Sequence, residues 1–472
     1  MRRTTQFLAA VGLAFVLAAP LAGCSLAPRY DRPSPQLPID WTGGAPAQSQ
    51  ANATRADWRQ VIVDEPMQRV VELALANNRD LRVAALKIQK AQAQYQIQRA
   101  DLLPKINAST GADMKRTPAT LSGTGFPVTT RAYSVGLGFS AFELDLFGRI
   151  QSLKDAALEQ FLATEAARRS VELNLVAEVA TAYLTLAADR EQLALAQEIL
   201  STEQASHEIV TYRFEYGVAG ELDLSRAQTT VDTARVQVAK YAAQVTADEN
   251  LLALLVGLPL APDLLPARSL AEVAPLIPAP AGLPSEVLAR RPDVLSAEHQ
   301  LKSANANIGA ARARHFPSIS ITGVFGSASN EISGLFTSGS GLWSFAPQIA
   351  LPIFQAGAIS AGVKVAEADR DILVAQYEKT VQTAFREVSD CLAQGASLIR
   401  QTEAQSSLTK ATGKSFELST LRYEAGVDSF LSKLDAQRSY ASARQNLISA
   451  RLSRLANTLT LYKALGGGWP DS

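Results

Sequence analysis

Two long stretches of the chain carry the spaced apolar pattern of α-helices. Proline is absent from Thr129 to Leu258 and again from Ile353 to Trp469, and glycine is sparse within both stretches. Because proline breaks helices and glycine weakens them, this composition predicts long helices. Apolar residues also recur every seven positions, as Val179, Leu186, Leu193 and Leu200, as Val374, Val381 and Val388, and as Tyr377, Ala384, Cys391 and Leu398. The last two series interleave in steps of three and four, which predicts an a/d packing seam.

Each long helix is expected to end at a Gly-Val pair, Gly217-Val218 or Gly426-Val427, where the chain can turn back. The first helix, from Arg149 to Tyr216, would be ~100 Å long at ~1.5 Å per residue. That length is too great for a compact domain and suits a tube that crosses a compartment. A dimeric coiled coil is the alternative reading of these helices.

Ahead of each long helix lies a different pattern, in which apolar residues alternate with small or polar ones. The apolar positions are Ile106, Ala108 and Ala112; Tyr133, Val135, Leu137, Phe139 and Ala141; Ile319 and Ile321; and Trp343, Phe345, Ile349 and Leu351. A period of two over about ten residues fits a tilted transmembrane strand, apolar toward lipid and polar toward a lumen. Pro347 is expected to interrupt the fourth strand. A soluble four-stranded domain is the alternative.

Four strands cannot span a membrane alone, because their two edges would leave unpaired backbone groups in lipid. Small membrane barrels need at least ~8 strands. If these strands cross the membrane, the barrel must therefore be shared between chains, although this argument does not fix the number of copies.

The sequence also contains an internal repeat. Leu75–Leu81 matches Leu288–Val294 at an offset of 213, and Arg213–Val218 matches Arg422–Val427 at an offset of 209. Self-similarity at a long period predicts two structural repeats. A proline-rich stretch joins them.

The beginning of the chain resembles a secretory signal peptide. Basic residues at Arg2 and Arg3 precede 16 uncharged residues, Phe7 to Ala22, and the stretch ends Leu21-Ala22-Gly23-Cys24. This exit resembles a bacterial lipobox, whose cysteine accepts a diacylglycerol, so Cys24 is the predicted lipidation site. Ser25 follows it and fits export to the outer membrane. An ordinary signal peptide with an incidental cysteine is the alternative, and no later segment is expected to form a membrane helix.

These signals divide the chain into six parts. They are a signal peptide at 1–23; a lipidated segment at 24–65; a first repeat at 66–260, with strands at about 105–143 and long helices at about 149–256; a proline-rich linker at 261–283; a second repeat at 284–466, with strands at about 318–353 and long helices at about 357–465; and a tail at 467–472.

Composition excludes several functions. Lys plus Arg equals Asp plus Glu at 45 each, so net charge indicates no nucleic-acid partner. The three histidines, His207, His299 and His315, are not spaced as metal ligands. Thr412–Ser415 ends like a phosphate loop but lacks the preceding glycine and strand. The sequence therefore predicts no enzyme, no metal site and no cofactor besides the lipid on Cys24.

Four segments carry a family resemblance: Arg290–Val294 with Ala297-Glu298, Ala311–Pro317, Tyr423–Val427 leading to Leu434–Arg438, and Leu461–Trp469. They are similar to the outer-membrane factor family, the TolC-like exit ducts of efflux and secretion systems, and most of all to its lipoprotein branch of the OprM type. One departure is Arg79, where the family usually has a proline, as at Pro292.

The resemblance implies a fold that is mainly α with a membrane β portion: a homotrimer whose 12-stranded β-barrel continues as a helical periplasmic tunnel. It implies a periplasmic adaptor and an inner-membrane transporter of the RND type as partners, and outer-membrane lipid around the barrel. It also implies a closed periplasmic tip, with Gly217 and Gly426 at the helix turns and Leu431, Asp435 and Arg438 as the gate. From the residues alone, Asp435 and Arg438 could equally be an exposed i,i+3 pair worth ~0.2–0.5 kcal/mol.

The expected function is that of a passive outer-membrane channel of a tripartite efflux system, carrying drugs or other small molecules. Protein secretion and metal efflux are alternatives within the same family. A lipid-anchored periplasmic coiled-coil protein without a barrel is the alternative outside it.

Overall fold

The computed structural model describes residues 25–34, 57–266, 269–270, 272–273 and 285–467. The chain divides into two compact units. We call the first the sheet unit, formed by Met1–Pro33, Lys87–Glu165 and Ser296–Tyr377, and the second the helical unit, formed by Ser34–Leu86, Ala166–Leu295 and Glu378–Ser472. Each unit takes segments from both halves of the sequence.

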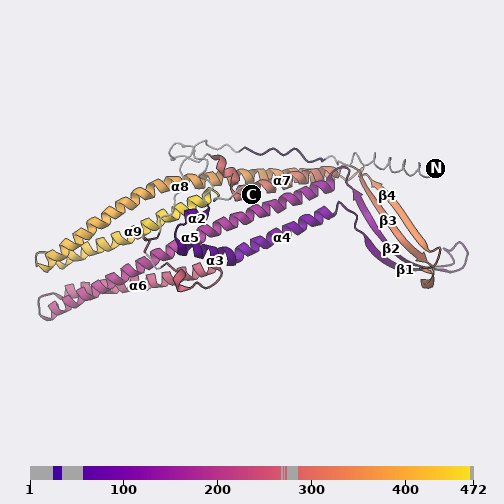
Figure 1. Ribbon diagram of the computed structural model, residues 1–472. Helices are drawn as coiled ribbons and strands as arrows, with labels where there is room; N and C mark the ends of the chain where they lie inside the picture. Colours follow the sequence, from indigo (N-terminus) through magenta and orange to yellow (C-terminus); the bar gives the residue numbers. More distant parts are fainter. Residues whose placement is uncertain (1–24, 35–56, 267–268, 271, 274–284, 468–472) are drawn as a thin grey trace. The chain divides into compact units, whose positions relative to one another are not determined.

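The two halves contain the same elements in the same order (Figure 1). The first has α4 (Arg79–Ala100), β1 (Asn107–Thr117), β2 (Val128–Leu144), α5 (Arg149–Glu215) and α6 (Glu221–Val256). The second has α7 (Pro292–Ala313), β3 (Ser318–Ser329), β4 (Gly341–Ala350), α8 (Ala358–Glu424) and α9 (Phe430–Ala464). Helices α4 and α7 have 22 residues each, and α5 and α8 have 67 each. The predicted pair of structural repeats is confirmed.

Short elements flank the repeats. They are α2 (Trp58–Val61), α3 (Glu65–Asn77), and the 3-10 turns η2 (Pro262–Leu264), η3 (Ser285–Arg290) and η4 (Ile332–Gly334). Asp64 begins α3, because its side chain accepts a hydrogen bond from the Met67 amide at 3.0 Å. Helix α3 packs its buried face into the main core of the helical unit.

The apolar seven-residue spacing lies on the buried side of both long helices. Val179 and Leu186 of α5 are fully buried, and Ala384 and Val388 of α8 are nearly so. Within the helical unit, α5 shares its core with α3, α6 and α9 through residues such as Leu252. Burial of this apolar stripe stabilises the helices more than intrinsic helix propensity does.

The four strands form one antiparallel sheet in the order β1-β2-β3-β4. Directly paired residues share a face, and successive residues alternate between faces. The register therefore gathers Leu137, Phe325, Trp343, Phe345 and Ile349 on one face, where all five are exposed. The opposite face is mostly small or polar, with Ser109, Gly136, Ser320, Thr322, Ser344 and Gln348, although Val324 and Leu342 also lie on it. The sheet thus has one apolar face and one polar face.

Two local features depart from regular alternation. A β-bulge shifts the β2–β3 register between Phe139 and Phe142, and Ala141 takes a positive φ of 52° there. Its amide donates to the Thr322 hydroxyl at 3.0 Å, which satisfies the backbone group that the bulge removes from the ladder. The prediction that Pro347 interrupts the fourth strand was wrong. Strand β4 runs through Pro347, because an edge strand has one side without a partner and can accommodate a residue that lacks an N–H.

One helix, α5, contains a stretch long and apolar enough to cross a membrane by composition, and 67% of that stretch is buried in the protein. This composition by itself does not show a membrane helix, so the expectation that no segment after the signal peptide forms one stays a prediction. A core helix meets the same criterion when its apolar face packs against neighbouring helices, as that of α5 does.

A glycine at the centre of the sheet gives a test of the β2–β3 pairing. A Cβ on Gly326 would lie 2.1 Å from the Val135 carbonyl oxygen, whereas one on Gly341 would meet nothing within 4 Å. We expect Gly326→Ala to lower the free energy of unfolding by about 1–3 kcal/mol, the usual cost of overpacking. Gly341→Ala is the matched control. Denaturant titration of the detergent-purified protein measures both, and equal stability of the two variants would contradict this packing.

Candidate functional site

The helical unit ends in two helix hairpins whose turns have the same backbone geometry. At the first, the Val218 amide donates to the Arg213 carbonyl at 2.8 Å and the Gly217 amide to the Phe214 carbonyl at 2.9 Å. At the second, Val427 and Gly426 make the equivalent bonds to Arg422 and Tyr423 at 2.9 and 3.0 Å. These are Schellman caps, which need a left-handed residue, and the two glycines have φ of 70° and 74°. Glycine at these positions therefore ends both 67-residue helices.

The two hairpins contact each other near these turns. Arg213 Nη1 donates to the Tyr423 hydroxyl at 2.6 Å, and its guanidinium lies 5.3 Å from the Tyr423 ring centre. An apolar cluster continues the contact and consists of Val210, Ala227, Phe430 and Leu434, with Leu224 and Tyr423 at its edge. The contact near the turns thus combines one polar interaction with a small apolar cluster.

The predicted gate residues lie at the beginning of α9. Ser429 caps this helix by accepting the Ser432 amide at 3.2 Å. Leu431, Asp435 and Arg438 share one exposed stripe, on which Leu431 is 42% exposed, while Leu434 is buried in the apolar cluster. No ion pair joins Asp435 to Arg438 in the described chain. Both charged groups are therefore available to a neighbouring molecule, and their role as a gate stays a prediction.

Sequence reasoning missed a buried carboxyl beside this stripe. Glu203 of α5 is 5% exposed, and its Oε2 has no hydrogen-bond partner in the described part of the protein. Burial raises the pKa of Glu203, opposed by the Thr230 hydroxyl, Lys433 and Arg438. The available signal was the seven-residue register, because Glu203 lies 14 residues after Asp189 on the buried side of α5.

Asp189 belongs to a second carboxyl cluster in the same hairpin. It lies within hydrogen-bonding reach of Asp248 on α6. Asp248 is 6% exposed and accepts the Gln244 side-chain amide at 3.1 Å through Oδ1, while its Oδ2 has no donor among the described residues. Two facing carboxyls can bond only when one is protonated. Burial, reinforced by Asp248 and opposed by Lys240, accordingly raises the pKa of Asp189 to about 7.

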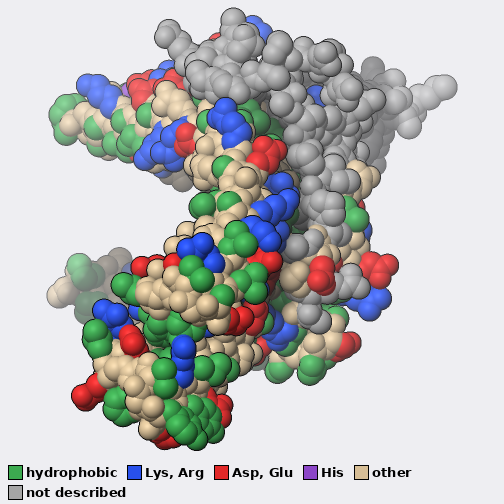
Figure 2. Space-filling view, turned by 90° about the vertical axis from the view of Figure 1, so that its left-hand side faces the viewer, with side chains coloured by type: hydrophobic (Ala, Val, Ile, Leu, Met, Phe, Trp, Pro, Cys, Tyr) green, Lys and Arg blue, Asp and Glu red, His purple; other side chains and the backbone are tan. Residues whose placement is uncertain are grey.

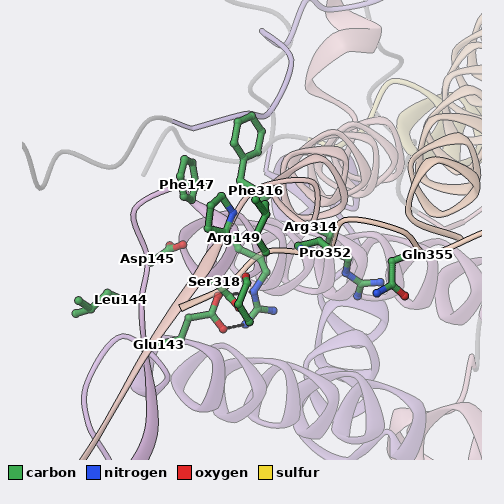
Figure 3. A pocket seen from close by; sticks show the side chains of 14 residues that line it. Glu143, Leu144, Asp145, Phe147, Arg149, Arg314, Phe316, Ser318, Pro352 and Gln355 are labelled. Carbon is green, nitrogen blue, oxygen red and sulfur yellow. Dashed lines mark hydrogen bonds and ion pairs between the residues drawn. The ribbon is translucent and has the colours of Figure 1, made fainter. Parts of the chain in front are cut away.

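The sheet unit has a pocket of about 510 Å³ where the strands join the helices (Figure 3). Arg149, at the start of α5, donates to Glu143, at the end of β2, with Nε 2.8 Å from Oε1. Asp145 accepts the Gln151 amide at 2.7 Å and so caps α5. Phe147 and Phe316 stack with ring centres 4.8 Å apart. These contacts hold the end of β2 against the beginning of α5 and join this connection to the α7–β3 connection.

The described residues also form neither a metal site nor a phosphate-binding loop. They contain no group of three or more residues that could hold a metal ion. Thr412–Ser415 lies inside α8, so it forms no phosphate loop. Figure 2 shows basic and acidic side chains interspersed over the face in view, which agrees with the equal numbers of both in the sequence.

The family model described as "Outer membrane efflux protein" matches residues 70–258 and 283–467, once in each repeat. The chain belongs to the outer membrane efflux protein family. It is therefore an outer-membrane transport protein and not an enzyme. The mainly helical fold with two repeats is the fold of this family, as the sequence predicted.

Individual members of the family are similar to this chain over almost its full length. The chain is 48% identical to the probable efflux pump outer membrane protein TtgC of Pseudomonas putida, over 95% of this chain and 93% of that protein. It is 42% identical to the outer membrane protein OprJ of Pseudomonas aeruginosa, over 97% and 96%. Among solved structures, the open state of the Neisseria gonorrhoeae MtrE outer membrane channel superposes with a TM-score of 0.86 at 38% identity, over 94% of this chain and 98% of that one.

Of the residues predicted from sequence as functional, the structure brings together Leu431, Asp435 and Arg438 on one stripe near the Gly426 turn. Gly217 occupies the corresponding turn of the other hairpin. Cys24 lies outside the described residues.

The Asp189 carboxyl predicts a pH dependence of stability. Because its folded pKa of about 7 is above the usual value of about 3.9, the folded state holds a proton that the unfolded state releases. Binding of this proton favours the folded state. The favourable contribution is complete below about pH 4 and is lost as pH rises to about 7. We expect the melting temperature of the wild type to fall between pH 5 and pH 8 relative to that of Asp189→Asn, whose amide stays neutral at every pH.

Glu208→Gln, an exposed neutralisation on the same helix, is the control and should follow the wild type. Parallel melting profiles for the wild type and Asp189→Asn would show that the pair holds no extra proton.

Proposed function

We propose that three copies of this chain assemble into a passive exit duct for a tripartite efflux system. In this proposal the three four-stranded sheets close into a 12-stranded barrel in the outer membrane, and the long helices form a tunnel through the periplasm. The observation that carries the proposal is the two-faced sheet, which has an exposed apolar face, a polar face and two edge strands.

The exposed apolar face argues against a barrel-free periplasmic protein. Trp343 and Phe325 are each 75% exposed, and Phe345 and Ile349 lie beside them on the same face. In water such a surface would favour aggregation, whereas in a bilayer it faces acyl chains. Strands β1 and β4 have no partner on their outer sides in the described chain. Pairing β4 of one copy with β1 of the next satisfies both edges without any additional segment.

The relatives support the proposed cargo and partners. TtgI is named a toluene efflux pump outer membrane protein, SrpC a solvent one and ArpC an antibiotic one. We propose drugs, solvents and similar small molecules as cargo of this chain, in preference to proteins or metal ions. The hairpin turns are the proposed contact for a periplasmic adaptor, which would connect the duct to an inner-membrane transporter of the RND type.

Lipidation of Cys24 is part of the same proposal. The described segment after it is held along α7, where Asn305 Nδ2 donates to the Pro28 carbonyl at 2.7 Å and Arg32 forms an ion pair with Glu298. A lipid on Cys24 would therefore be tied to the sheet unit through this segment. Mass spectrometry of the mature amino terminus identifies the modified residue, and an unmodified mature Cys24 would contradict the proposal.

The exposed stripe of α9 is the proposed gate. Around a threefold axis, Leu431 would form an apolar ring that excludes water, and Asp435 would pair with Arg438 of a neighbouring helix. Opening would break these contacts when adaptor and pump dock. Glu203 of the same chain is a second possible carboxyl partner for Arg438 besides Asp435, since Glu203 and Arg438 interact electrostatically.

We expect Leu431→Ala combined with Asp435→Ala to raise the single-channel conductance of the purified protein in planar bilayers. The reason is that the variant removes both the apolar ring and the ionic contact while leaving the sheet unchanged. Asn446→Ala, an exposed change further along α9, is the control and should leave conductance unchanged.

The oligomeric state of the double variant must be measured beside its conductance. Unaltered conductance in normally assembled protein would mean that these residues are not the constriction. A purified wild-type protein that never conducts, with or without the substitutions, would contradict the duct itself.

A further inference from the structure

A groove of about 620 Å³ lies in the helical unit between the middle parts of α8 and α9. Its apolar floor includes Leu447 and Leu455 of α9 together with Leu270, all three of which are buried. The hydroxyl-bearing Ser406 and Ser407 of α8 line one side. The groove thus offers both apolar contact and hydrogen-bonding groups.

Three cationic side chains line the same groove. Lys410 comes from α8, and Arg451 and Arg454 come from α9, and Glu403 is the one acidic residue among the described lining residues. In the described structure none of the three cations has an ion pair or a side-chain hydrogen bond. Their separation of three residues places Arg451 and Arg454 on one side of α9.

Several guanidinium groups elsewhere in the helical unit have carboxylate partners, unlike those of the groove. Arg190 pairs with Glu249 at 2.7 Å, Arg291 with Glu387 at 2.9 Å, and Arg444 with Glu198 at 2.7 Å. The guanidinium groups of the groove have the same chemistry but form no ion pair in the described structure, although Glu403 also lines the groove. They are therefore free to make bidentate bonds to a carboxylate from outside the chain.

We propose that this groove binds a carboxylate-bearing peptide, and that its occupant is a peptide stem of the cell-wall peptidoglycan. The inference rests on the proposed function, which places the helical unit in the periplasm, where the cell wall is a polymer rich in free carboxyl groups. Binding would hold the duct to the wall as it passes through.

The lining favours a peptide over a polyphosphate or another uniformly anionic polymer. Glu403 would repel a chain of phosphates, but it can accept hydrogen bonds from the amide or amino groups of a peptide. Leu447 and Leu455 give apolar contact to aliphatic side chains such as alanine. Net charge of the lining is positive, so the complementary ligand carries an excess of carboxylates.

The test is co-sedimentation of the full-length, detergent-purified protein with purified peptidoglycan sacculi. We expect the combined variant Lys410→Gln, Arg451→Gln and Arg454→Gln to bind at least about tenfold more weakly, since each lost charge-assisted hydrogen bond alone is worth about that factor. Lys379→Gln, an exposed neutralisation elsewhere on α8, is the control and should bind as the wild type does. Soluble muropeptides should compete, whereas muropeptides with amidated carboxyls should not.

Equal binding by the wild type and the triple variant would overturn the proposal, as would competition by inorganic polyphosphate alone. Single-channel conductance of the same preparations separates this inference from the proposed function. Normal conductance with no sacculus binding rejects the groove and leaves the duct intact, whereas absence of conductance in the wild type rejects the duct.

Discussion

The backbone groups along the outer edges of β1 and β4 set the main constraint on this protein. Within one chain these N–H and C=O groups have no partner strand in the described structure. In water they could bond to solvent, but in lipid each would cost several kcal/mol. Because the sheet also exposes an apolar face, water is an unfavourable environment for it as well. In the proposed assembly, pairing with other copies satisfies the edges, and the bilayer covers the apolar face.

The helices follow from a different constraint. Long proline-free segments with buried residues at seven-residue spacing can extend without interruption, and glycines with positive φ end both at the same length. The hairpins contact each other near the turns through Arg213 and Tyr423, and further along through Glu198 and Arg444. Two hairpins whose long helices end at equivalent turns suit the proposed gate, which must open without unfolding the helices.

Much of this could be predicted from the sequence, because periodicity and turn residues are local signals. The helix turns and the alternating faces of the strands follow from residues close together in the chain, and the repeats follow from the similarity of its two halves. The prediction for Pro347 was wrong because a strand can contain a proline when it lies at the edge of a sheet, and the edge position of β4 is a property of the whole sheet. The carboxyls of Asp189 and Asp248 meet only after α5 and α6 fold back on each other, so no local pattern identifies their shared environment. The same holds for Lys410 and Arg451, which meet across a hairpin.

The number of chains in the conducting particle tests the central claim most directly. Native mass spectrometry of the protein in mild detergent, performed on the fraction that conducts in planar bilayers, gives that number. Edge pairing between sheets of four strands, closed into a barrel of 12, predicts three chains and no conducting monomer. A monomer that conducts ions would contradict the account, because it would mean that the strand edges need no partner from another chain.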